Sequence, residues 1–65
     1  MLNGIKKARL CAGISQTDLA KELHITPGSI SQWEQGKTRP SVKRLKRIAE
    51  ILGTTVEELL VERVS

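Results

Sequence analysis

The apolar residues of this chain recur at intervals of three and four positions, which is the spacing of one face of an α-helix. Five such stretches follow one another, and each is bounded by residue types that start or end helices. We expect the first helix to be capped by Asn3, to carry Ile5, Ala8 and Ala12 on one face, and to stop at Gly13.

The second and third predicted helices are joined by a very short link. Ser15 and Asp18 form a capping box at the start of the second helix, and Thr26 followed by Pro27 marks the start of the third. The link consists of His24, Ile25 and Thr26, and helices joined so tightly cross at a steep angle. We expect the third helix to run from about Pro27 to Gln35, and the inward side chains of the pair to be Leu19, Ala20, Leu23, Ile30 and Trp33, with the small Ala20 at the closest approach.

Two more helices complete the predicted set. Ser41 can cap a fourth helix that stops at Gly53, and Thr54 with Glu57 form a capping box for a fifth. The apolar positions of these two helices are Val42, Leu45, Ile48, Ala49, Leu52, Val56, Leu59 and Leu60. The chain has one Trp and neither Phe nor Tyr, which argues against a sheet. We therefore predict a compact all-α fold of five helices, with residues 1–65 forming a single domain.

Charge is distributed unevenly along this chain. The formal net charge is +4 and the pI about 9.7, which favours polyanionic partners. Residues 37–47 include six basic side chains and no acidic one, whereas residues 48–65 carry four glutamates against one arginine. A basic stretch of this kind is equally compatible with a solvated helix face, so a further feature has to decide between the two.

Other chemistries find little support. A chain of 65 residues leaves little room for a deep pocket, and it shows no paired carboxylates, no nucleophile with an orienting base and no phosphate loop. Cys11 and His24 are the only residues of their types, so we expect no disulfide, no metal site and no cofactor, and we expect Cys11 to be buried or half-buried. No apolar run approaches a membrane span of about 20 residues. We expect a cytoplasmic, non-enzymatic protein without membrane or small-molecule partners.

The outer face of the third predicted helix is the deciding feature. It consists of small and amide residues without charge, namely Pro27, Gly28, Ser29, Ser31, Gln32 and Gln35. A plain solvated helix more usually carries Lys and Glu there, whereas a glutamine can pair in bidentate fashion with adenine in the major groove. The basic stretch begins directly after this helix, where phosphates would fix the register. The pattern favours sequence-specific DNA binding.

The ordered motifs of the chain resemble those of the phage-repressor and Cro-like (XRE-like) helix-turn-helix family. The matching stretches are Ile14-Ser15-Gln16-Thr17-Asp18-Leu19-Ala20, Ile30-Ser31-Gln32-Trp33-Glu34-Gln35-Gly36-Lys37, then Pro40 and Leu45 with Ile48-Ala49-Glu50-Ile51-Leu52-Gly53. The resemblance covers about residues 3 to 61. It implies a lambda-repressor-like fold whose second and third helices form the helix-turn-helix.

The resemblance also implies roles for individual residues. Base-reading positions are Pro27, Gly28, Ser29, Ser31 and Gln32; phosphate-binding positions are Gln16, Lys37, Thr38, Arg39 and Lys43. Arg9 and Glu34 match a partly buried ion pair of some relatives, the alternative being two unrelated surface charges. Trp33 could stack on a base, but its spacing from Ile30 favours the core. His24 stands where relatives often have glycine, because the chain passes through left-handed dihedrals there.

Members of this family usually bind DNA as two-fold dimers. The candidate interface is Leu60, Val61 and Val64, with ordinary core packing as the alternative. The resemblance implies a repressor acting on a palindromic operator as a homodimer. An antitoxin, a DNA-binding fragment of a longer repressor and a protein-interaction adaptor on the same fold remain open. Because Pro27 and Gly28 have no polar reach, readout there is limited to apolar contact, for instance with a thymine methyl.

Overall fold

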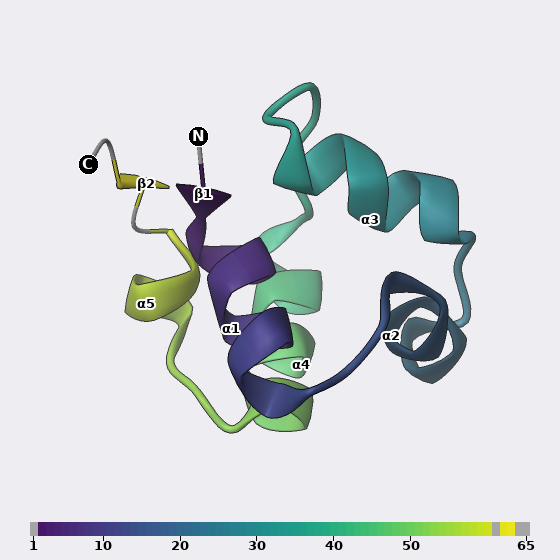
Figure 1. Ribbon diagram of the computed structural model, residues 1–65, viewed down its shortest axis with the longest axis horizontal. Helices are drawn as coiled ribbons and strands as arrows, with labels where there is room; N and C mark the ends of the chain where they lie inside the picture. The colour runs from purple at the N-terminus through teal and green to yellow at the C-terminus, as the bar shows by residue number, and fades with distance from the viewer. Residues whose placement is uncertain (1, 61, 64–65) are drawn as a thin grey trace.

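The helices of the computed structural model follow the predicted order along the chain (Figure 1). The structure describes residues 2–60 and 62–63. Its helices are α1 (Gly4–Ala12), α2 (Gln16–Leu23), α3 (Pro27–Glu34), α4 (Val42–Leu52) and α5 (Val56–Leu59), and its strands are β1 (Leu2–Asn3) and β2 (Glu62–Arg63). The all-α class with five helices is confirmed, because the two strands are only two residues long each.

The capping signals are correct for two helices. The Ser15 hydroxyl accepts a hydrogen bond from the Asp18 N–H at 3.0 Å, and the Ser41 hydroxyl accepts one from the Arg44 N–H at 3.2 Å. These bonds satisfy backbone donors that have no partner inside their helices. At α3 the predicted capping hydrogen bond of the Thr26 hydroxyl is absent, whereas Pro27 is the first helical residue, as predicted.

The predicted cap of α5 is wrong, whereas that of α1 by Asn3 stays a prediction. Asn3 directly precedes α1 and lies in β1, which pairs antiparallel with β2 in the register Asn3↔Glu62. The N-cap of α5 is Thr55, whose hydroxyl accepts from the Glu58 N–H at 3.2 Å. Thr54 instead belongs to the end of α4, because its backbone N–H donates a hydrogen bond to the Ala49 carbonyl oxygen at 2.9 Å.

Gly4 lets α1 approach α5 more closely than any other residue would. A Cβ on Gly4 would lie 2.6 Å from the backbone carbonyl of Leu59 and closer still to the carbonyl oxygen of Glu58. The strands β1 and β2 pair beside this contact (Figure 1). Periodicity could not predict the strands, because two residues show no alternation.

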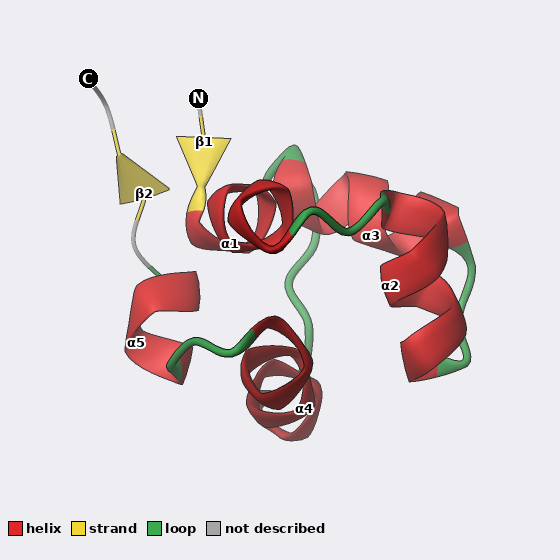
Figure 2. Cartoon of the chain, turned by 60° about the horizontal axis from the view of Figure 1, so that its bottom comes forward, coloured by secondary structure: helices red, strands yellow, loops and turns green. Residues whose placement is uncertain are grey.

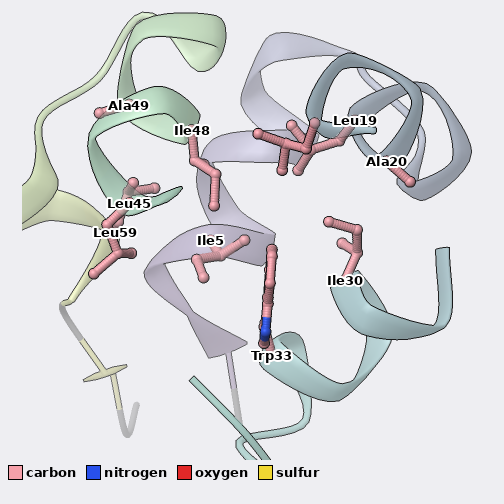
Figure 3. Packing of buried hydrophobic residues seen from close by; sticks show 10 residues of the cluster. Ile5, Leu19, Ala20, Ile30, Trp33, Leu45, Ile48, Ala49 and Leu59 are labelled. Carbon is pink, nitrogen blue, oxygen red and sulfur yellow. The ribbon is translucent and has the colours of Figure 1, made fainter. Parts of the chain in front are cut away.

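The core is built from all five helices (Figure 3). Its buried apolar residues are Ile5, Leu19, Ala20, Leu23, Ile30, Trp33, Leu45, Ile48, Ala49 and Leu59. The indole of Trp33 points inward beside Ile5, so the core interpretation of this residue is confirmed. Figure 2 shows α2 and α3 together on one side of the molecule, with α5 and the strand pair on the other.

Three apolar side chains are more exposed than predicted. Cys11 and Ala12 are exposed on α1, and Val42 is 66% exposed at the first position of α4. Cys11 lies two positions after the buried Arg9, which at about 3.6 residues per turn puts it on the opposite side of the helix. Ala12 is the last residue of α1 and Val42 the first residue of α4, so both lie at helix ends.

The turn between α2 and α3 has the left-handed residue that was expected. His24 has φ 57° and ψ 43°, and it is the one non-glycine residue with positive φ in the part of the chain that the structure describes. The Ile25 N–H donates to the Ala20 carbonyl at 3.0 Å, which closes α2 and turns the chain toward α3. Ala20 is 1% exposed, as its place at the helix crossing requires.

Candidate nucleic-acid interface

One side of α3 faces away from the core and carries no charge. Ile30, Trp33 and Glu34 are buried on the inner side. The predicted reading face lies on the other side, where Pro27, Gly28, Gln32 and Gln35 are exposed and Ser29 and Ser31 are half-buried. The structure therefore brings the predicted base-reading residues together on one accessible helix face.

The side chains of this face differ in whether they form hydrogen bonds within the protein. The hydroxyls of Thr26 and Ser29 lie 3.3 Å apart, and Gln35 Nε2 donates to Ser31 Oγ at 2.8 Å. Among the described residues the Gln32 side chain has no hydrogen-bond partner. At Gly28 a Cβ would meet only Thr26 Oγ1, at 3.9 Å. Both the N–H groups and the oxygen of the Gln32 amide are therefore available to a ligand. At Gly28 a ligand can come close to the helix backbone.

Basic side chains lie next to this face along the chain. Lys37, Thr38 and Arg39 are exposed in the loop between α3 and α4, and Lys43 is exposed in the first turn of α4. All the residues predicted to bind phosphate in this segment are accessible. Arg44 has a different role, because its Nη1 donates to the Leu23 carbonyl at 3.4 Å and joins the start of α4 to the end of α2.

A buried polar cluster joins the reading helix to the rest of the fold. Arg9 Nε donates to Glu34 Oε2 at 2.6 Å and Arg9 Nη2 donates to Glu34 Oε1 at 3.2 Å, with the residues 8% and 7% exposed. Arg9 Nη1 also donates to the Ile14 carbonyl at 2.9 Å. The two predicted partners therefore form a buried, bidentate ion pair between α1 and α3 and are not separate surface charges.

Gln16 belongs to the same cluster, which was not predicted. Its Nε2 donates to Glu34 Oε1 at 2.9 Å, so α1, α2 and α3 meet at one carboxylate. No buried side-chain nitrogen or oxygen among the described residues lacks a partner, which is the condition under which a buried ion pair is tolerated. Gln16 lies 18 positions from Glu34 in the sequence, and no local pattern could have indicated the contact.

The predicted dimer residues are only partly described. Leu60 is 54% exposed directly after α5. Val61 and Val64 lie outside the described residues. Leu10 and Val42 are the other large apolar side chains that are exposed in the described part of the chain.

Two further features are absent from the residues that the structure describes. No helix there is both long and apolar enough to cross a membrane. No group of three or more His, Cys, Asp or Glu side chains there could hold a metal ion.

Comparisons with known proteins agree with this geometry. Residues 5–59 match the family described as "Helix-turn-helix". The chain is 34% identical over 56 residues to the HTH-type transcriptional activator BcrR of Enterococcus faecalis, covering 86% of this chain and 28% of that protein. It is 34% identical over 61 residues to an uncharacterized HTH-type transcriptional regulator of Methanocaldococcus jannaschii, covering 94% and 92%.

A phage protein is also similar. The chain is 41% identical over 44 residues to the 26 kDa repressor protein of Escherichia phage HK022, covering 68% of this chain and 19% of that protein. It therefore spans 28% of the activator and 19% of the phage repressor, but 92% of the Methanocaldococcus jannaschii regulator.

Solved structures share the fold. Hydroxypropylphosphonic acid epoxidase from S. wedmorenis aligns with a TM-score of 0.81 and 30% identity, over 89% of this chain and 31% of that one. The clp gene regulator ClgR from Corynebacterium glutamicum aligns with a TM-score of 0.79 and 25% identity, over 86% of this chain and 60% of that one. The same arrangement of helices thus occurs in a regulator and in one part of an enzyme.

Proposed function

The chain belongs to the helix-turn-helix family of DNA-binding transcriptional regulators, and from that premise we propose that it is a repressor that reads a palindromic operator with α3. In this proposal α3 lies in the major groove of double-stranded DNA. The protein acts in the cytoplasm of a bacterial or phage-infected cell, where it occludes a promoter.

The observation that carries the proposal is the uncharged, exposed face of α3. Its inner side is held by core packing and by the Arg9–Glu34 pair, so the face is presented on a fixed element. Small side chains let the helix come close to base edges, and Gln32 has the two groups that recognise adenine N6 and N7. Exposed cations follow immediately at Lys37 and Arg39.

We assign the residues to two roles. Base contacts come from α3, through Pro27, Gly28, Ser29, Ser31 and Gln32. Phosphate contacts come from Gln16, Lys37, Thr38, Arg39 and Lys43. Base contacts distinguish sequences, whereas phosphate contacts set the register and supply a salt-dependent affinity.

A dimer would contact a longer DNA site than a single module can. A single module of this kind buries roughly 600–1,000 Å² on DNA, and two modules related by a two-fold axis read half-sites about one helical turn apart. The exposed Leu60 supports an interface at the C-terminal end, which we extend to Val61 and Val64. Sedimentation at saturation on a palindromic operator should show two chains per duplex, and a single bound chain would contradict the dimer.

Repression is favoured over activation by the similarity to a phage repressor, although the similar BcrR is named an activator. An antitoxin, the DNA-binding part of a longer regulator and a protein-interaction adaptor are the competing functions. An adaptor would not need a cationic loop beside an uncharged helix face. We propose no enzymatic activity, because the similarity to the epoxidase extends over only 31% of that enzyme.

Selection of binding sites from random duplex DNA at near-physiological salt tests the proposal. We expect a motif of two inverted half-sites about 10 base pairs apart, as two-fold dimers require. Placed in a promoter, the recovered motif should lower reporter expression when the protein is present. Increased expression would assign an activator, and failure to recover any motif with folded protein would favour the adaptor.

A further inference from the structure

The two glutamines on the outer side of α3 differ in what they bind. The Gln32 amide has no partner among the described residues. Gln35, the C-cap residue of the helix, instead donates from Nε2 to the hydroxyl oxygen of Ser31 at 2.8 Å. Residues four positions apart are neighbours on a helix surface, so the bond lies along the reading face. The proposed function assigns no role to Gln35, although its side chain is exposed there.

The bond from Gln35 determines how the Ser31 hydroxyl can be used. A serine hydroxyl has one O–H donor and two acceptor lone pairs, and its hydrogen rotates to suit its partners. The Gln35 N–H occupies one lone pair, so the hydroxyl hydrogen of Ser31 points elsewhere. In a helix this hydrogen can go to the carbonyl four residues back, but among the described residues the Ser31 hydroxyl donates no hydrogen bond. The O–H group is therefore available to an acceptor outside the protein.

The four bases differ in the groups that they present in the major groove. Guanine N7 and O6 and thymine O4 are acceptors, cytosine presents only its N4 amino donor, and adenine has one group of each kind. A serine whose hydrogen rotates freely can pair with either kind of group. A Ser31 hydroxyl that has to donate favours guanine or thymine over cytosine, because two donors that face each other leave both without a partner.

We propose that Gln35 is a positioning residue that makes Ser31 a hydrogen-bond donor toward DNA, so that Ser31 selects a base with a major-groove acceptor and rejects cytosine. The inference rests on the proposed function, in which Ser31 reads a base, and adds a residue that acts through Ser31. The bond is present in the protein without DNA. The hydroxyl is therefore oriented before it meets the base, and binding requires little further ordering.

Substitutions of Gln35 can remove or reverse this hydrogen bond. Gln35→Glu keeps the shape of the side chain, but a carboxylate only accepts hydrogen bonds. The Ser31 hydroxyl then donates to the carboxylate and turns a lone pair toward DNA, so cytosine becomes the favoured base. Gln35→Ala removes the bond altogether, which lets the hydroxyl rotate and accept or donate as the base requires.

The experiment compares base preferences of wild type, Ser31→Ala, Gln35→Ala and Gln35→Glu on duplexes that differ from the selected site at one position. The position that faces Ser31 is the one at which Ser31→Ala removes the preference. There the wild type should bind guanine or thymine about 3- to 10-fold more tightly than cytosine, which corresponds to one hydrogen bond. Gln35→Ala should bring this ratio close to one, and Gln35→Glu should invert it. Loss of folded protein would weaken binding to every duplex alike, so the ratio reports on the contact.

The same substitutions in a Ser31→Ala background separate an indirect effect from a direct one. A glutamate can accept from cytosine N4 by itself, so Gln35→Glu could create a contact of its own. If Gln35 acts through Ser31, neither substitution should alter the base preference once the hydroxyl is removed. Ser29 provides a matched control, because its hydroxyl lies 3.3 Å from that of Thr26 and not beside Gln35. Preferences at all other positions, including any that Ser29→Ala removes, should be unchanged by substitution of Gln35.

Three results would overturn the inference while DNA binding itself stands. The first is a change of preference by Gln35→Glu that persists without the Ser31 hydroxyl, which would assign direct reading to Gln35. The second is a wild-type preference for cytosine at the position facing Ser31. The third is a Ser31→Ala variant that keeps every base preference. If the wild type recovered no motif at all, the proposed function would fail together with this inference.

Discussion

At the scale of single residues, we expect the side chains of Gln32 and Arg39 to contribute to DNA binding in different ways. Gln32 has an amide without an internal partner among the described residues, whereas Arg39 is an exposed cation in the following loop. An amide can distinguish one base from another, and a guanidinium on a phosphate cannot. The two roles can be separated by measuring binding on preferred and random DNA.

Gln32→Ala should weaken binding to the selected site by about 1–3 kcal/mol and change binding to random DNA little. Arg39→Ala should weaken both by similar amounts and flatten the salt slope by about one. Titrations of each variant on both duplexes measure these effects. If the two substitutions acted alike on specific and random DNA, the division into reading and anchoring residues would be wrong.

Gly28 allows a second prediction at this scale. Gly28→Ala should leave the free energy of unfolding unchanged or raise it by up to about 1 kcal/mol, because the new methyl enters open space and alanine favours the helix. Binding to the selected site should nevertheless weaken by about 1–3 kcal/mol, because the methyl crowds a close interface. Unchanged affinity would show that the bases do not approach α3 at this position.

At the scale of helices and strands, the orientation of α3 depends on contacts that come from two other helices. Core packing at Ile30 and Trp33 positions the helix, and the Glu34 carboxylate ties it to α1 and α2. A buried charge that loses its partner is strongly destabilising, whereas an exposed ion pair contributes little. This cluster should therefore govern both stability and the presentation of the reading face.

Glu34→Gln should lower the free energy of unfolding by about 3–5 kcal/mol, because it leaves the Arg9 guanidinium buried without a countercharge. The matched control is Glu50→Gln, which removes an exposed partner of Arg47 at 3.8 Å and should change stability by less than about 1 kcal/mol. Urea denaturation of both variants measures the difference. Similar losses in the two would contradict the importance of burial for this pair.

At the scale of the whole molecule, the fold is completed by contacts between residues near the start of the described chain and residues near its end. α1 packs on α5 through Gly4, and the strand pair joins residues 2–3 to residues 62–63. The capping and periodic signals of each helix are local and do not specify this contact. The strand β2 lies on the side of the molecule away from α2 and α3 (Figure 2).

Gly4→Ala should destabilise the protein by about 1–3 kcal/mol, because its methyl would overlap backbone atoms of α5 that cannot move independently. Thermal unfolding should show a lower midpoint than for wild type. Gly28→Ala is the matched control, since it adds the same methyl group where there is space. Equal stability of the two variants would mean that α5 can shift away from α1 at little cost.

The sequence by itself determined those features that depend on neighbours within a turn or two. Ser15 and Ser41 cap their helices through residues three positions away, His24 ends α2 in the expected conformation, and the period of three to four gave the buried face of α3. The uncharged outer face of α3 and the cations after it could also be predicted from the sequence, because a helix of known extent places each residue on one of its sides.

Only the tertiary structure decided which distant residues meet. The carboxylate of Glu34 collects Arg9 from 25 positions away and Gln16 from 18, and Gly4 accommodates α5. Even the choice of Thr55 over Thr54 followed from how α4 ended. These outcomes depend on the path of the chain and on packing between helices, since hydrogen bonds and steric exclusion act over a few ångströms of space regardless of separation in sequence.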